Sequence, residues 1–134
     1  MRRTSILIAV CMVAMMGITL YAQRDIVPIM KEGVGPTNIA MNKATDSKEV
    51  VADAEKLQTL FKEVGVFMKA QKQTPAVGWA NDAVAAAGDV AKASKAGDAA
   101  GLAAAKKTLG ATCITCHNVH RDMTGGVSKY KPAP

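Results

Sequence analysis

Two cysteines and a histidine near the end of the 134-residue chain stand at a spacing that could carry chemistry, Cys113-Ile114-Thr115-Cys116-His117. The spacing C-x-x-C-H is the attachment signature of a covalently bound c-type haem. In that chemistry the two thiols add across the two vinyl groups of the haem, and the imidazole that follows is placed to ligate the iron. On a helix the three side chains fall at i, i+3 and i+4 and share one face. We therefore predict that Cys113 and Cys116 hold one haem c and that His117 is the proximal ligand of its iron.

Two other interpretations of a C-x-x-C pair need features that this sequence lacks. A thioredoxin-like redox pair lies in a βαβ unit, and a structural zinc site needs further Cys or His ligands at finger spacing. The one cysteine outside the motif is Cys11, which lies in a segment that we expect to be removed. Haem attachment is therefore the favoured interpretation.

Residues 1–22 have the features of a secretory signal peptide. Two arginines precede an apolar run from Ile6 to Leu20, and Ala22 is a small residue before a polar stretch. The run falls short of the roughly 20 residues needed to span a bilayer, so an uncleaved anchor is the weaker alternative. We predict cleavage after Ala22, a single mature domain of residues 23–134 with no membrane span, and a periplasmic location. Export agrees with haem attachment, which takes place on the outer side of the membrane.

The mature chain is mildly basic. Without Arg2 and Arg3, 15 basic residues stand against 11 acidic ones, a formal balance of +4. The lysines are scattered and the mature chain has only four aromatic residues, so no stacking surface for nucleic acid is indicated. We expect no nucleic-acid partner, and redox proteins are the partners that a haem motif implies.

The first predicted helix runs from Asp25 to about Ala44. Its apolar positions step by three or four residues, as one helical face requires: Ile26, Met30, Val34, Thr37 and Met41. Pro36 disfavours α geometry at Gly35. We therefore expect this helix to be kinked or split there and to resume at Thr37.

Two longer helices follow. Asp46 and Glu49 predict a capped start for the second helix, which carries an unbroken apolar stripe: Val50, Ala54, Leu57, Phe61, Val64 and Met68. Thr74 and Pro75 predict the cap and first residue of the third helix. Its expected inner face is Trp79, Ala83, Ala86, Val90 and Ala93.

The fourth predicted helix carries the haem motif. It runs from about Ala99 until Gly125-Gly126 ends it, and we expect the tail, Val127 to Pro134, to be frayed. Four helices with short connections and no credible strand predict an all-α, antiparallel four-helix bundle with one covalently attached haem c on the C-terminal helix. Because the core has few large apolar side chains, we expect the haem to supply missing apolar volume and the apoprotein to be poorly folded.

The chain resembles the class II c-type cytochromes, the family of cytochrome c prime and its low-spin, methionine-ligated relatives. The resemblance rests on the haem motif in the last helix, on Arg121 four residues after the histidine, on Trp79, and on the turn Ala96-Gly97-Asp98. It covers essentially the whole mature chain. It implies the bundle fold, one haem c with its iron, and a position for Arg121 near the haem. His120 stands where family members usually carry an aromatic residue.

The resemblance also implies the residue on the other side of the iron. In this family the first helix supplies it, and matching Ile29-Met30-Lys31 to the family's distal segment places Met30 at the ligand position. The residues alone allow another interpretation of each position. Met30 is equally typical of a methionine in a helix core, and Arg121 is equally typical of an exposed charge at a helix end. His/Met ligation raises the reduction potential relative to bis-imidazole ligation and favours electron transfer over substrate binding.

The function that the resemblance implies is that of a periplasmic monohaem electron carrier, and not of an enzyme. The alternative is a five-coordinate haem protein of the cytochrome c prime type, whose vacant distal site binds NO or CO. Many family members pair through their first two helices, so the resemblance also allows a homodimer.

Overall fold

The computed structural model describes residues 25–134 of the chain, and the predicted signal peptide lies outside them. One helical stretch near the start has three parts: α2 (Ile26–Pro28), the π-helix η1 (Ile29–Val34) and α3 (Gly35–Lys43). Three long helices follow: α4 (Ser47–Ala70), α5 (Thr74–Lys95) and α6 (Ala99–His120). The described chain ends in a small hairpin: β1 (Arg121–Asp122), the 3-10 turn η2 (Thr124–Gly126) and β2 (Lys129–Tyr130).

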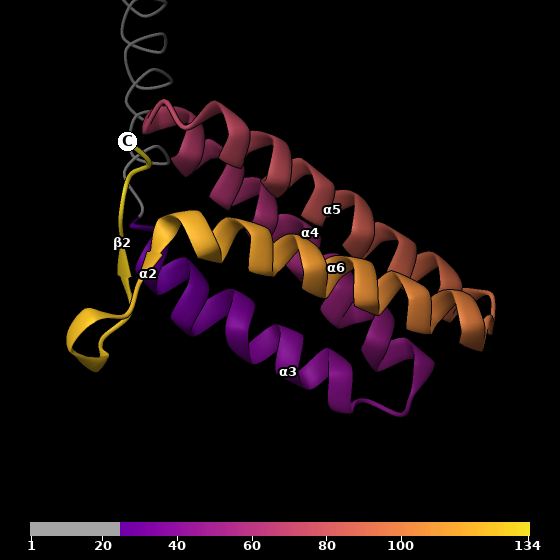
Figure 1. Cartoon of the computed structure of the whole chain (residues 1–134). Helices are drawn as coiled ribbons and strands as arrows, with labels where there is room; N and C mark the ends of the chain where they lie inside the picture. The colour runs from indigo at the N-terminus through magenta and orange to yellow at the C-terminus, as the bar shows by residue number, and fades with distance from the viewer. Residues whose placement is uncertain (1–24) are drawn as a thin grey trace, which may run out of the picture.

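The helical stretches form an antiparallel all-α bundle (Figure 1). The start of α4 meets the end of α5, where the Ser47 hydroxyl donates to the Ser94 carbonyl at 2.8 Å. The Lys106 ammonium, early in α6, donates to the Met41 carbonyl, late in α3, at 3.1 Å. The architecture predicted from the periodicity is therefore confirmed in its arrangement of helices. No helix of residues 25–134 is both long enough and apolar enough to cross a membrane.

The core lies along α4 and α5. Every residue of the predicted α4 stripe, from Val50 to Met68, is buried. The α5 face was predicted only in part, because Trp79 and Ala93 are half-buried. Since α5 packs against both α4 and α6, it buries a wider face, made largely of alanines: Ala76, Ala80, Ala83, Ala86, Ala87, Val90 and Ala91.

An aspartate side chain caps three of the four helical stretches that the structure describes. Asp25 accepts from the Val27 amide at 3.2 Å at the start of α2. Asp46 accepts from the Lys48 amide at 2.6 Å, and Asp98 accepts from the Gly101 amide at 2.9 Å. The prediction that Thr74 caps α5 was wrong, because Thr74 is already helical and Gln73 occupies the cap position without a side-chain bond. Proline still lies in the first turn of α5, where its missing N–H breaks no helical bond.

The first helix changes from α-type to π-type hydrogen bonding before Pro36 and does not break. Of the predicted kink or split at Gly35, the split is absent, because the chain stays helical through Pro36. The departure from α geometry is the π-helix η1, after which the Gly35 amide donates to the Met30 carbonyl. A proline lacks the N–H for an α-helical bond and its ring crowds the carbonyl four residues back, so the wider turn relieves that conflict. The buried residues therefore step by five from Ile29 to Val34, and Met30 is only half-buried.

The tail is ordered as a hairpin, contrary to the prediction of a frayed end and of no strand. Helix α6 ends at His120, before the two glycines, and β1 pairs antiparallel with β2. Gly125 and Gly126 have φ values of 80° and 74°, a left-handed conformation that glycine adopts readily, so they form the hairpin turn and not a helix end. The Lys131 amide donates to the His120 carbonyl at 3.0 Å, which returns the tail to the end of α6.

Candidate functional site

The haem motif lies in the last two turns of α6. Cys113, Cys116 and His117 are all half-buried, and all three line the same cavity. Both cysteines are free thiols. The prediction that the i, i+3, i+4 spacing would bring the three side chains to one face agrees with this position.

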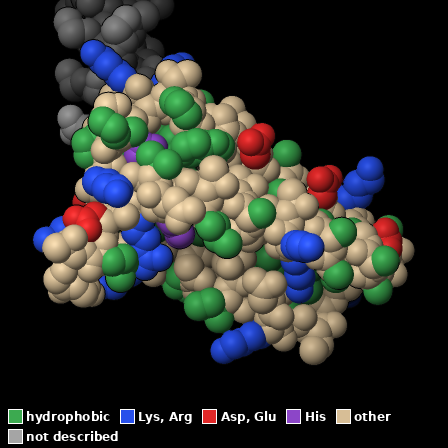
Figure 2. Space-filling view, viewed as in Figure 1, with side chains coloured by type: hydrophobic (Ala, Val, Ile, Leu, Met, Phe, Trp, Pro, Cys, Tyr) green, Lys and Arg blue, Asp and Glu red, His purple; other side chains and the backbone are tan. Residues whose placement is uncertain are grey.

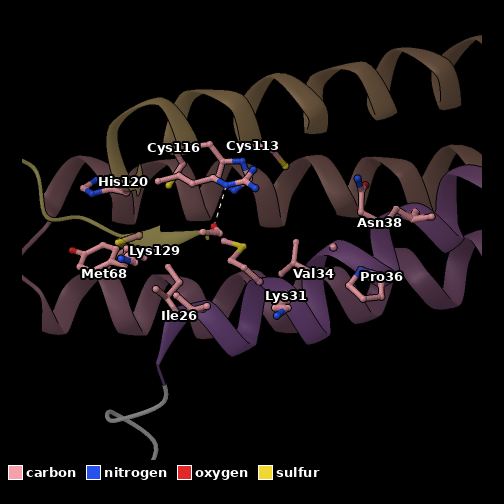
Figure 3. A pocket seen from close by; sticks show the side chains of 18 residues that line it. Ile26, Lys31, Val34, Pro36, Asn38, Met68, Cys113, Cys116, His120 and Lys129 are labelled. Atoms are coloured by element: carbon pink, nitrogen blue, oxygen red, sulfur yellow. Dashed lines mark hydrogen bonds between the residues drawn. The ribbon is translucent and has the colours of Figure 1, made fainter. Parts of the chain in front are cut away.

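The cavity has a volume of about 440 Å³ and separates the first helix from α6. Figure 3 shows Cys113 and Cys116 on one side of it and Ile26, Val34 and Lys31 on the other. Met68 of α4 and His120 lie toward one end. The volume falls in the range of about 300–1,000 Å³ that is usual for small-molecule and cofactor sites.

Met30 faces the haem motif across this space. It lines the main cavity and also a smaller one of about 30 Å³. Cys113, Cys116 and His117 line both cavities as well, and Val34 is the fifth residue that they share. The structure thus brings together residues that stand more than eighty positions apart in the chain.

Burial changes the pKa values of the two cysteines and the histidine of the motif. It raises the pKa of the Cys113 thiol, and it raises the pKa of the Cys116 thiol with a further contribution from Cys113. Both groups therefore remain protonated thiols near neutral pH. Burial also lowers the pKa of His117, and the positive charge of Arg121 lowers it further. His117 is therefore neutral, with a nitrogen lone pair available to a metal.

Arg121, the remaining predicted site residue, lies at the cavity mouth as the first residue of β1. Its side chain is exposed and lines the cavity, and its Nε donates to the Ser128 hydroxyl at 3.1 Å. It is therefore both a charge just past a helix end and a group close to the predicted haem position. Lys31 of η1 and Lys129 of β2 line the same cavity.

Sequence reasoning missed the aromatic cluster that holds the hairpin against the bundle. Tyr130 packs edge-on against Phe67 with ring centroids 5.2 Å apart, and stacks on His120 at 5.8 Å. The tilted ring of Trp79 also lies near His120, with ring centroids 6.0 Å apart. The one signal in the sequence was the Gly125-Gly126 pair, which marks a tight turn as readily as a helix end.

The residues at the cavity suit a haem better than a bare metal ion. Within residues 25–134, no group of three or more His, Cys, Asp or Glu side chains could hold a metal directly. A haem iron takes four ligands from its porphyrin, so one imidazole and one thioether complete it. The cavity is lined mostly by apolar side chains, with two thiols on one wall, and this lining fits the group that the motif implies.

No protein family, curated protein or solved structure matches this chain.

Proposed function

We propose that this protein is a periplasmic monohaem c-type cytochrome of the class II kind that carries electrons between redox proteins. One observation supports this most strongly. Cys113, Cys116, His117 and Met30 line the same cavity, although they come from opposite ends of the described chain. They supply two thiols for attachment and two axial ligands, and no substrate is transformed.

The two cysteines attach the haem. Cys113 and Cys116 would hold the haem through thioether bonds, each made by addition of one thiol, both sulfur and hydrogen, across one vinyl group. The addition consumes no oxidant. Because burial raises the pKa of both thiols, they remain protonated until they react. The link then holds the haem on α6 beside His117.

The identity of the two residues that would ligate the iron, His117 and Met30, determines whether the haem carries electrons or binds a substrate. Burial and, to a smaller extent, the Arg121 charge lower the pKa of His117, so a neutral ring nitrogen would be available to ligate the iron. Met30 supplies a thioether from the opposite wall. When bound, a haem with this ligand pair cycles between two iron oxidation states at a raised potential. Because His117 and Met30 would both ligate the iron, no position on it would be open to a substrate, and such a site suits electron transfer.

Absorption spectra of the holoprotein in both oxidation states test this proposal. We expect a c-type haem spectrum that survives acid extraction, low-spin iron in both states, and no carbon monoxide binding by the reduced protein at neutral pH. A high-spin reduced spectrum with ready carbon monoxide binding would contradict Met30 ligation and support the gas-binding alternative. Absence of covalent haem would overturn the proposal as a whole.

Replacing the distal residue gives the sharper test. Met30→Ala removes the thioether and leaves the iron open on that side, so the reduced variant should become high-spin and bind carbon monoxide. Met123→Ala is the matched control, because Met123 is 49% exposed and lines neither cavity. If Met30→Ala leaves the spectrum unchanged, the sixth ligand lies elsewhere.

A further inference from the structure

The charged residues that line the main cavity are all cationic. They are Lys31, Arg121 and Lys129, and no Asp or Glu is among the lining residues. Most of the other lining side chains are apolar. Such a lining selects a ligand with a large apolar body and anionic groups, because the cations stabilise negative charge beside a surface of low polarity.

The three cations lie at the mouth of the cavity and not in its depth. All three are exposed, and they come from the first helix and from both strands of the hairpin. Figure 2 shows Lys and Arg side chains gathered at the end of the molecule that carries the hairpin. Anionic groups held there keep contact with water while the apolar body lies inside.

The arginine is oriented for such a contact. Its Nε donates to the Ser128 hydroxyl across the hairpin, and no other partner of the guanidinium lies among the described residues. The two terminal amino groups are thus available to a carboxylate. The nearby Asp122 does not line the cavity, and its carboxylate accepts from the amide and hydroxyl of Thr124.

The hairpin that carries two of the cations is fixed to the bundle. His120 Nδ1 donates to the Lys131 carbonyl at 3.1 Å, and the Lys131 amide donates back to the His120 carbonyl at 3.0 Å. These bonds and the stacking of Tyr130 on His120 hold β2 in place. Lys129 is therefore held at the cavity mouth by the element that the sequence did not predict.

We infer that Lys31, Arg121 and Lys129 form a subsite for carboxylates, which in the holoprotein are the two propionates of the haem. This inference rests on the proposed function. The guanidinium offers a planar pair of donors to a carboxylate, whereas the two ammonium groups act as flexible point charges. The subsite fixes which edge of the haem faces the solvent.

The infrared spectrum of holoprotein with isotopically labelled haem carboxylates tests the subsite. Arg121→Gln and Lys129→Gln should each shift the carboxylate stretching bands, because each removes a charged donor. Lys43→Gln is the matched control, since Lys43 is exposed on the same helical stretch as Lys31 but lines neither cavity. The control should leave the bands in place, and far-ultraviolet circular dichroism should show unchanged helix content in all variants.

Two results would overturn the inference, and they separate it from the proposed function. If covalent haem is present and the carboxylate bands stay unchanged in Arg121→Gln, Lys129→Gln and Lys31→Gln, the subsite is wrong while the cytochrome proposal stands. If the wild-type protein carries no covalent haem, both fail together.

Discussion

Tyr130 contacts three parts of the molecule, two through its ring and one through its backbone. Its ring contacts Phe67 of α4 and stacks on His120 at the end of α6, while its backbone pairs with Arg121 in the hairpin. Its hydroxyl oxygen is buried and has no hydrogen-bond partner among residues 25–134. The ring therefore stabilises the hairpin by packing, whereas the hydroxyl is desolvated without compensation.

Tyr130→Phe should keep the packing and remove the unpaired hydroxyl. We expect the free energy of unfolding at neutral pH to be unchanged or to rise by up to about 1 kcal/mol. Burial, with a smaller contribution from Cys116, raises the pKa of Tyr130 above its usual value of about 10. The unfolded chain therefore loses this proton at lower pH than the folded protein, so the free energy of unfolding falls as pH rises above about 10. The variant should lack that loss.

Urea unfolding of the holoprotein at neutral pH and above about pH 10 measures both effects. A Tyr130→Phe variant that is destabilised by more than about 1 kcal/mol at neutral pH would show that the hydroxyl has a partner in the holoprotein.

At the scale of elements, the sequence correctly predicted the buried helix face that follows from hydrophobic periodicity and the helix start that follows from a capping residue. The α4 stripe and the Asp46 cap were correct because each depends on residues close in the chain. The hairpin was missed because its stability comes from His120 and Phe67, which no local pattern connects to Tyr130. Met30 was named only through a family resemblance, since a methionine at helical spacing is usual in a core.

The π-helix is the element that decides how Met30 lies. An α-helical stretch would keep Met30 and Val34 on one buried face, whereas the observed pattern buries Ile29 and leaves Met30 at the cavity. Pro36→Ala restores an N–H to the helix interior and removes a residue that disfavours the α form by about 3 kcal/mol. We expect the stretch to return to α geometry, which would turn Met30 away from its present position and weaken the iron ligation that we propose for it.

Carbon monoxide binding to the reduced Pro36→Ala holoprotein measures this change, and it should increase. Pro75→Ala is the matched control, because that proline lies in the first turn of α5 and interrupts no helical bond. A Pro36→Ala spectrum identical to wild type would show that the π-helix does not depend on the proline.

The hydrogen bond between His120 and the Lys131 carbonyl gives a second prediction at the scale of elements. A carbonyl oxygen only accepts, so Nδ1 of His120 carries the hydrogen that it shares with Lys131. His120→Phe keeps an aromatic ring near Trp79 and Tyr130 but removes this hydrogen bond, worth about 1 kcal/mol. The Lys131 amide should exchange with solvent about fivefold faster, while amides in the middle of α4 should not change. Unchanged exchange at Lys131 would mean that stacking alone holds the hairpin.

At the scale of the whole molecule, the bundle has a thin core on the side of the cavity. The residues that are both large and fully buried are Met41, Leu57, Met68, Leu109 and Val90, and most of the α5 face is alanine. The cavity of about 440 Å³ lies where the first helix and α6 would otherwise contact each other. The haem that we propose would fill that space and contact both helices, so we expect folding and haem attachment to be coupled.

The double variant Cys113→Ser, Cys116→Ser tests this coupling, because it removes both attachment points and changes each side chain by one atom. Purified without haem, it should lose several of the ~5–15 kcal/mol typical of a folded domain and unfold over a broad range of urea. Circular dichroism during urea unfolding measures this. Cys11→Ser is the control, since Cys11 lies in the predicted signal peptide and its loss should leave the mature holoprotein unchanged. A sharp transition at the holoprotein midpoint in the double variant would show that the helices pack stably around the cavity by themselves.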